Sequence, residues 1–132
     1  MRVVLDTNVF VSMALRGRVG EIYTAWKAEK FKLIISQAIF SEYLDVLQRP
    51  KLHLDAESVS TLVAYLQRKA EFVSPGETIQ AIEADPSDNK FLEAALAGKA
   101  VYIVSGDHHL LELHSFRGVE IISAQEFISH LK

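Results

Sequence analysis

Two aspartates follow apolar runs of this 132-residue sequence, and their position suggests a chemical role. Asp6 comes directly after residues 3–5 (VVL), and Asp107 comes shortly after residues 101–104 (VYIV). Such runs predict buried strands of a parallel sheet. In open α/β sheets, ligands bind just beyond the carboxyl ends of the strands. The two carboxylates therefore predict a negatively charged site that requires a cation.

Two further acidic residues come from other segments of the chain. Glu42 flanks the apolar stripe of a helix expected over residues 37–48, so helical periodicity alone favours a surface position. Asp88 lies in the segment DPSD, where Asp85 fits the N-cap of a helix and Pro86 its first residue. Asp88 then either simply favours the helix N-terminus or belongs to the site, and the two roles are compatible.

The residues at the strand ends also have purely structural interpretations. Asp6 can be a turn residue that bonds the backbone two residues on, and the apolar, irregular residues after it argue against a helix cap. Asp107 can cap a helix expected over residues 108–114. Asn8 is either a turn asparagine or a group that orients a carboxylate ligand. Ser105 is a candidate for bonding a metal-bound water or a phosphate.

The side chains available for metal binding favour hard cations. The chain has no cysteine, which excludes thiolate sites and disulfides. His108 and His109 are adjacent, so on a helix they are expected to point roughly 100° apart and to make a poor ligand pair. Carboxylates without imidazole or thiolate suit Mg²⁺ or Mn²⁺. A water polarised by such an ion can attack a phosphodiester bond.

The expected elements place these residues in an α/β fold. Strands alternate with helices, which predicts βαβ units with right-handed crossovers and helices on both faces of the sheet. Ser36 and Asp55 are expected helix N-caps. We expect one domain over residues 1–132, a three-layer α/β/α sandwich with a central mostly parallel sheet. The expected strands cover 3–6, 33–35, 71–73, 101–104 and 119–122; the expected helices cover 19–29, 37–48, 55–70, 86–98, 108–114 and a terminal stretch with Phe127, Ile128 and Leu131.

Composition and charge describe an ordinary globular chain. Hydrophobic residues make up 49%, and no apolar run approaches the roughly 20 residues that span a bilayer. An acidic residue at position 6 is too early for a signal peptide, so a soluble cytoplasmic protein is expected. The net charge of −3 argues against attraction of nucleic acid to the whole surface. The charge does not exclude a local basic strip that binds nucleic acid, although each candidate taken alone is typical of a solvated surface charge. The candidates are Arg16, Arg18, Lys27, Lys30 and Lys32.

Four blocks of the sequence together resemble the PIN-domain ribonucleases. They are residues 6–9 (DTNV), 41–42 (SE), 85–94 (DPSDNKFLEA) and 105–107 (SGD). Each block alone is weak evidence, but their order and spacing make the set specific. The resemblance continues through residues 121–127, and it is greatest to the prokaryotic PIN branch of toxin components from toxin–antitoxin pairs.

The resemblance implies a metal-dependent ribonuclease. It implies a four-acid catalytic and metal-binding site made of Asp6, Glu42, Asp88 and Asp107. It also implies supporting polar positions at Asn8 and Ser105, with Asp85 and Asn89 as adjacent candidates. The expected cofactor is Mg²⁺ or Mn²⁺, the expected substrate is RNA, and the expected partners are a second copy of the chain and a small antitoxin that blocks the site.

Two other functions stay open at this level. A phosphatase of the haloacid dehalogenase class also begins from an aspartate after its first strand, but it needs a second Asp two residues on as general acid, where this chain has Asn8. A non-catalytic PIN-like binding or regulatory module is the other alternative. Tyr23, Trp26 and Tyr43 could stack RNA bases, yet their helical spacing favours the core. The helices over 37–48 and 55–70 are the expected dimer surface.

Overall fold

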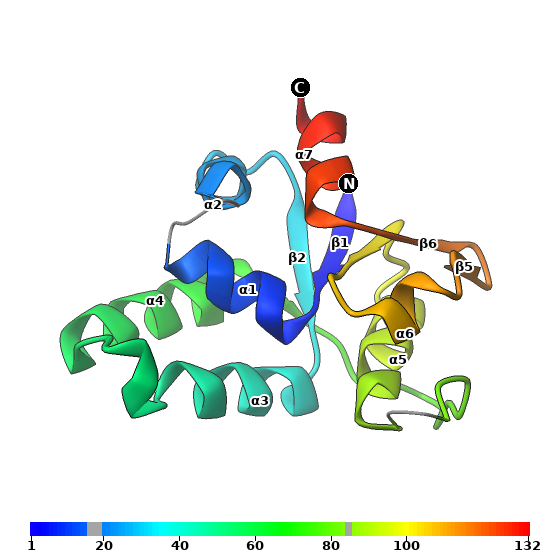
Figure 1. Cartoon of the computed structure of the whole chain (residues 1–132), viewed down its shortest axis with the longest axis horizontal. Helices are drawn as coiled ribbons and strands as arrows, with labels where there is room; N and C mark the ends of the chain where they lie inside the picture. Colours follow the sequence, from blue (N-terminus) through cyan, green and yellow to red (C-terminus); the bar gives the residue numbers. More distant parts are fainter. Residues whose placement is uncertain (16–19, 84–85) are drawn as a thin grey trace.

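The computed structural model describes residues 1–15, 20–83 and 86–132, and these form a mostly parallel six-stranded sheet flanked by helices (Figure 1). The strand order is β3-β2-β1-β4-β6-β5, in which only β5 runs antiparallel to its neighbour. The expected fold class is confirmed. The strands are β1 (Arg2–Leu5), β2 (Lys32–Ile35), β3 (Glu71–Phe72), β4 (Tyr102–Val104), β5 (Ser115–Phe116) and β6 (Val119–Ile122).

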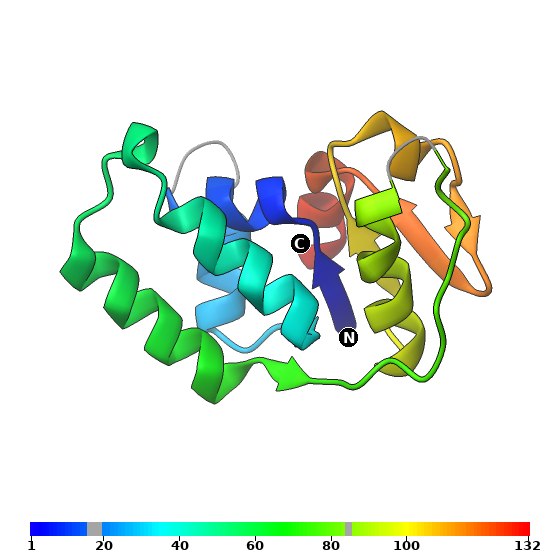
Figure 2. The ribbon, with the colours of Figure 1, turned by 90° about the horizontal axis from the view of Figure 1, so that it is seen from below.

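Seven helices and two short 3-10 turns lie in the described residues. Helix α5 contacts β1, β2 and β4, whereas α1 lies across the other face of the sheet beside α2, which contacts α7 (Figures 1 and 2). None of these helices is long and apolar enough to cross a membrane. The helices are α1 (Thr7–Ala14), α2 (Gly20–Lys27), α3 (Gln37–Leu47), α4 (Ala56–Lys69), α5 (Asn89–Ala97), α6 (His108–Leu111) and α7 (Ala124–Leu131); the 3-10 turns are Pro50–Leu52 and Pro86–Asp88.

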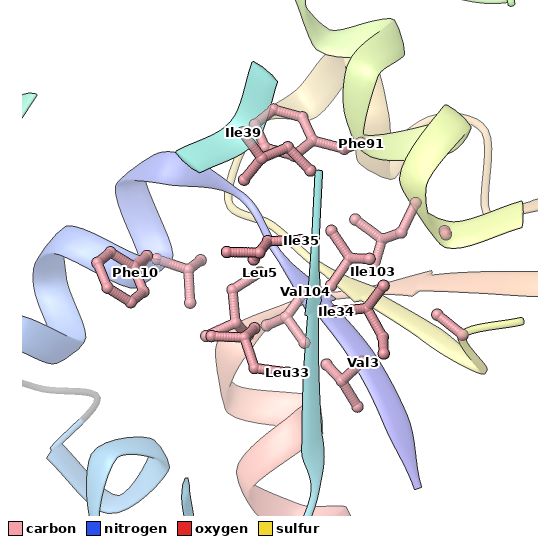
Figure 3. Packing of buried hydrophobic residues seen from close by; sticks show 14 of the residues in the cluster. Val3, Leu5, Phe10, Leu33, Ile34, Ile35, Ile39, Phe91, Ile103 and Val104 are labelled. Atoms are coloured by element: carbon pink, nitrogen blue, oxygen red, sulfur yellow. The ribbon is translucent and has the colours of Figure 1, made fainter. Parts of the chain in front are cut away.

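After their first residues, Arg2 and Lys32, the central strands β1 and β2 are apolar because both faces of the sheet are covered. In β2, Leu33 and Ile35 point to the side of Phe10 on α1, and Ile34 points to the opposite side (Figure 3). The side chains of residues 3–5 and 33–35 are fully buried. Alternating apolar and polar residues mark a sheet with one wet face, so an unbroken apolar run is what a doubly covered strand requires.

Helix α1 corrects the expectation that residues 6–8 form a turn and that Asp6 does not cap a helix. Asp6 is its N-cap, and the Asp6 carboxylate oxygen Oδ1 accepts a hydrogen bond from the Val9 backbone N–H at 2.8 Å. Val9, Phe10, Val11 and Met13 are all buried in this helix. A helix buried on most of its sides has no polar face, and it therefore lacks the periodicity by which sequence reveals a helix.

The remaining elements fall close to their expected ranges. Ser36 and Asp55 are confirmed as N-caps, accepting backbone hydrogen bonds from Ile39 and Ser58 at 3.3 and 2.6 Å. The helix expected over 86–98 is instead a 3-10 turn followed by α5. The expected cap Asp85, like Arg16 and Arg18, lies outside the described residues. The hairpin strand β5 was not expected, because two residues are too few to show alternation.

Tyr43 of α3 fixes that helix against the end of β1. Its hydroxyl donates to the Leu5 backbone carbonyl at 2.5 Å, and its ring stacks on Phe10 with centroids 4.0 Å apart. Tyr43 and Trp26 are buried, which confirms them as core residues, while Tyr23 is half-buried. The tyrosine therefore ties α1, α3 and β1 together at one end of the sheet.

Gly98, after α5, provides a test of the packing between this helix and the sheet. A Cβ atom at this position would lie 2.4 Å from the Ile34 Cγ2 atom and 3.2 Å from the Ala94 carbonyl oxygen. We expect Gly98→Ala to lower the free energy of unfolding by about 1–3 kcal/mol in urea titrations, because the packed β-branched neighbour must move. Gly76→Ala is the control, since a Cβ there meets nothing within 4 Å, and it should change stability by less than about 0.5 kcal/mol. Equal effects of the two changes would contradict this account.

Candidate functional site

The pairing of β1 with β4 brings the first two site residues together. Leu5 is in register with Val104, and the Asp6 backbone N–H donates to the Val104 carbonyl at 3.0 Å. Asp6 and Ser105 therefore leave neighbouring strands at the same edge of the sheet. The Ser105 hydroxyl donates to the Asp6 carboxylate oxygen Oδ2 across a sequence separation of 99. The predicted clustering of strand-end residues is thus present.

Asp6 is a nearly buried carboxylate, with 4% of its surface exposed. Burial raises the pKa of Asp6 above its ordinary value, and the negative charge of Asp107 raises it further. Hydrogen bonds from Ser105, Val9 and Gly106 favour the ionised form but do not offset the burial. Ionised Asp6 is therefore destabilised by its surroundings, which is the condition that a nearby cation would relieve.

Ser105 links the two aspartates. Its hydroxyl oxygen accepts a hydrogen bond from the Asp107 backbone N–H at 2.9 Å while its proton goes to Asp6. The serine is fully buried, so it holds this arrangement without competition from solvent. Asp107 is half-buried and caps α6, as expected, with its Oδ1 accepting from the His109 N–H at 2.8 Å. Ser105 thus joins the two aspartates, and its supporting role in catalysis stays a prediction.

Glu42 is half-buried between α1 and α5, and not on the open surface that helical periodicity favours. Its Oε2 accepts a hydrogen bond from the Thr7 hydroxyl, and its Oε1 pairs with the Lys90 ammonium at 2.6 Å. The charges of both Asp6 and Glu42 contribute, after burial, to a Tyr43 pKa well above the ordinary value, which places both carboxylates near that hydroxyl. Periodicity failed here because a position beside the apolar stripe of α3 meets α1 and α5.

Thr7 and Lys90 are the site residues that our sequence reasoning missed. Thr7 directly follows Asp6, and Lys90 lies two residues after Asp88. Both fall within the sequence blocks that resemble PIN domains, which was the available signal. The Lys90–Glu42 contact brings the start of α5 to α3, and Asp88 lies half-buried at that helix start.

Asn89 has a structural role that its residue type did not reveal. It is buried, and its amide nitrogen donates to the carbonyls of Ile82 and Pro86 at 3.1 and 3.2 Å. Its amide oxygen accepts from the Ile82 N–H at 2.9 Å. The side chain thus fastens the segment before α5 to the helix that follows Asp88. Asn8, by contrast, is exposed on the first turn of α1.

The two adjacent histidines contradict the expectation that they point apart. The rings of His108 and His109 have centroids 4.0 Å apart with a 40° tilt. One ligand atom from each of His108, His109 and Asp107 lies within 4.8 Å of the others. Side-chain rotation brings the two imidazoles together although their Cα–Cβ bonds diverge on the helix. The start of α6 thus offers imidazole nitrogens beside the carboxylate oxygens of Asp107.

The residues at the strand ends fit a divalent cation. Asp6 and Asp107 are close enough for the charge of one to affect the ionisation of the other. Within the described residues, neither carboxylate forms an ion pair with a lysine or arginine. Two neighbouring carboxylates without a lysine or arginine partner in this part of the chain are a donor set suited to a hard metal ion.

Comparison with known families agrees with this arrangement. A family model described as the PIN domain matches residues 2–109, a span that contains all four acidic candidates. The chain belongs to the PIN-domain family. No curated protein matches it.

Solved structures with the same fold cover nearly the whole PIN chain. PAE2754 from Pyrobaculum aerophilum is 12% identical with a TM-score of 0.67, covering 99% of this chain and 89% of its own. VapBC2 from Rickettsia felis, bound to a DNA fragment from its promoter, is 18% identical with a TM-score of 0.61, covering 93% and 98%. VapBC-1 from nontypeable Haemophilus influenzae is 14% identical with a TM-score of 0.61, covering 95% and 99%. At these identities the likeness shows the fold.

Asp6→Asn should make the metal-free protein more stable at neutral pH. Because the folded-state pKa of Asp6 is raised, the contribution of this group to stability is present at acidic pH and is lost as pH rises through the raised value. Asparagine keeps the helix cap and removes the buried charge. We expect the stability gain in EDTA to shrink as pH is lowered below the ordinary aspartate pKa, as measured by urea unfolding across pH.

Asp55→Asn is the matched control for this measurement. Asp55 is also a helix N-cap, but its pKa is lowered by the hydrogen bonds of Ser58, so native stability from this group increases as pH rises. The asparagine variant should therefore lose stability at neutral pH where Asp6→Asn gains it. If both asparagine variants lost stability at neutral pH, burial would not be the factor that controls the pKa of Asp6.

Proposed function

We propose that this PIN domain is a metal-dependent endoribonuclease that hydrolyses RNA phosphodiester bonds. The observation that carries the proposal is the buried Asp6 carboxylate beside Asp107, without a lysine or arginine paired to either among the described residues. Burying a charge in this way is costly unless a cation offsets it. Carboxylate oxygens at the carboxyl ends of parallel strands also lie where α/β folds bind ligands.

The proposed roles follow from the position of each carboxylate. Asp6, Asp88 and Asp107 would hold Mg²⁺ or Mn²⁺, and Glu42 would help to hold the ion or orient the attacking water. When bound, such an ion supplies a polarised water and offsets negative charge on the phosphate. Ser105 keeps Asp6 and Asp107 in a fixed relation through its two hydrogen bonds. Four carboxylates from separate elements thereby act on one phosphodiester.

We further propose that the protein is the toxin of a toxin–antitoxin pair, with a small antitoxin partner. The support is likeness of fold to two VapBC structures, together with the sequence blocks that resemble prokaryotic PIN toxins. A homodimer is part of the proposal. Its proposed surface is the groove between α3 and α4, which is lined by apolar side chains that include Leu44, Leu54, Val59 and Val63.

Cleavage of a mixed single-stranded RNA pool tests the nuclease proposal. The native chain should cut in Mn²⁺ or Mg²⁺ and not in EDTA. Asp6→Asn should lower the rate by about a hundredfold or more, because it removes a ligand of the ion that activates water. Product formation on denaturing gels, with circular dichroism as the check on folding, measures both effects.

Asp45→Asn is the control for this assay. Asp45 lies on the same helix as Glu42 but is 74% exposed and pairs with Arg49, so its loss should leave cleavage unchanged. A fully active Asp6→Asn variant would overturn the assignment. A native chain that neither cleaves RNA nor gains heat stability from metal would be a binding module, because an ion bound only by the folded state must stabilise that state.

A further inference from the structure

The ammonium of Lys90 lies within the candidate site and is paired with one of its four acids. Its Nζ atom is 2.6 Å from the Glu42 oxygen Oε1, and the Lys90 side chain is only 18% exposed. The other ion pairs among the described residues are formed by side chains at least 37% exposed. This pair is thus the most shielded from solvent, where attraction between charges is screened least.

Both oxygens of Glu42 are engaged. Oε1 accepts from Lys90, while Oε2 accepts from the Thr7 hydroxyl. Because Thr7 directly follows Asp6, this hydrogen bond also orients Glu42 toward the end of β1. A metal ion at Glu42 would therefore have to share an oxygen with one of these two donors.

The candidate site therefore has two parts with different charge balance. We call the part with Asp6 and Asp107 the Asp6–Asp107 corner, and the part with Glu42 and Lys90 the helix corner. At the strand ends, Asp6 and Asp107 lie near each other without a lysine or arginine paired to either in the described residues. At the helix corner, Glu42 already has a cation. Two-metal nuclease sites place their ions roughly 3.5–4 Å apart, where they offset the charge of the attacking and leaving oxygens.

We propose that Lys90 stands in for a second divalent cation at Glu42, so that the substrate-free protein binds one ion, at the Asp6–Asp107 corner. Glu42 is then a positioning residue for the ammonium. This inference rests on the proposed function and specifies its metal stoichiometry. A second divalent ion at Glu42 would lie next to the ammonium, and like charges at such short range repel strongly in a partly buried site.

The same placement suits the ammonium to RNA phosphate. An ammonium group has three donors, and the Glu42 contact uses one of them. The remaining donors can reach a phosphate oxygen because Lys90 retains some exposure. Lysine binds phosphate as a point charge, without the fixed two-point geometry of arginine. Lys90 would thus offset phosphate charge where a second ion does so in two-metal sites.

Titration calorimetry with Mn²⁺ on the native chain and on Lys90→Met tests the proposal. Methionine is unbranched and of similar length but neutral. The native chain should bind one Mn²⁺ ion. Lys90→Met should either bind a second ion or bind Mn²⁺ about tenfold more tightly, because a positive charge beside the site is removed. Lys90→Arg keeps the charge and should retain the native stoichiometry.

Two controls separate charge from general effects. Lys69→Met removes an exposed lysine that pairs with Glu29 at 2.9 Å, and it should bind Mn²⁺ as the native chain does. The double variant Glu42→Gln, Lys90→Met removes the carboxylate that a second ion would need, and it should bind no second ion. Circular dichroism verifies that each variant is folded.

The results distinguish this inference from the proposed function. If the native chain binds one ion and cleaves RNA, yet Lys90→Met has unchanged stoichiometry and affinity, only the inference fails. Two ions bound by the native chain would also overturn it. If neither protein binds Mn²⁺ and the native chain does not cleave, the proposed function fails and the inference fails with it. A second ion in Lys90→Met that is lost on adding Glu42→Gln would establish Lys90 as the substitute cation.

Discussion

The parallel pairing of β1 with β4 is the constraint on which the site depends. It places the ends of two strands, and hence Asp6 and Ser105, side by side although they are far apart in sequence. The pairing is stable because helices cover both faces of these strands, and the apolar side chains of the strands are thereby buried away from water. The polar residues immediately beyond the strands are then held by a core that they do not themselves have to stabilise.

The acidic site draws on stability that the core provides. Asp6 is buried beside a second carboxylate, and its raised pKa shows that the folded protein opposes its charge. The fold keeps that charge in place through a helix cap and a buried serine. Tyr43 adds rigidity by joining α3 to the carbonyl of Leu5. Such an arrangement is typical of a binding site, where unfavourable electrostatics in the free protein favour association with a ligand of opposite charge.

Sequence patterns predicted the sheet well and the site less evenly. Apolar runs identified the long strands because burial on both faces leaves an unmistakable composition. Helix α1 was missed because the same burial removes the polar face of a helix. Helical periodicity predicted a surface position for Glu42, because it assumes that the side of a helix away from its apolar stripe faces solvent. In α3 that side instead meets two other helices. Only the resemblance to PIN domains identified Glu42 as a site candidate. No sequence pattern linked it to Lys90, which lies 48 positions away.

The long connection between β3 and α5 runs past the outside of α5 (Figure 2), and side chains of α5 hold its described residues by hydrogen bonds. Glu93 accepts from the Ile79 N–H at 2.9 Å, and Asn89 accepts from the Ile82 N–H at the same distance, while both isoleucines are nearly buried. These anchors lie outside the hydrogen-bond ladder of the sheet. The described part of this connection, residues 73–83, therefore forms a separate cooperative unit whose opening requires less free energy than global unfolding. Asp88 directly precedes Asn89, which holds Ile82, so its amide exchange should follow that of this segment and not that of Asp6.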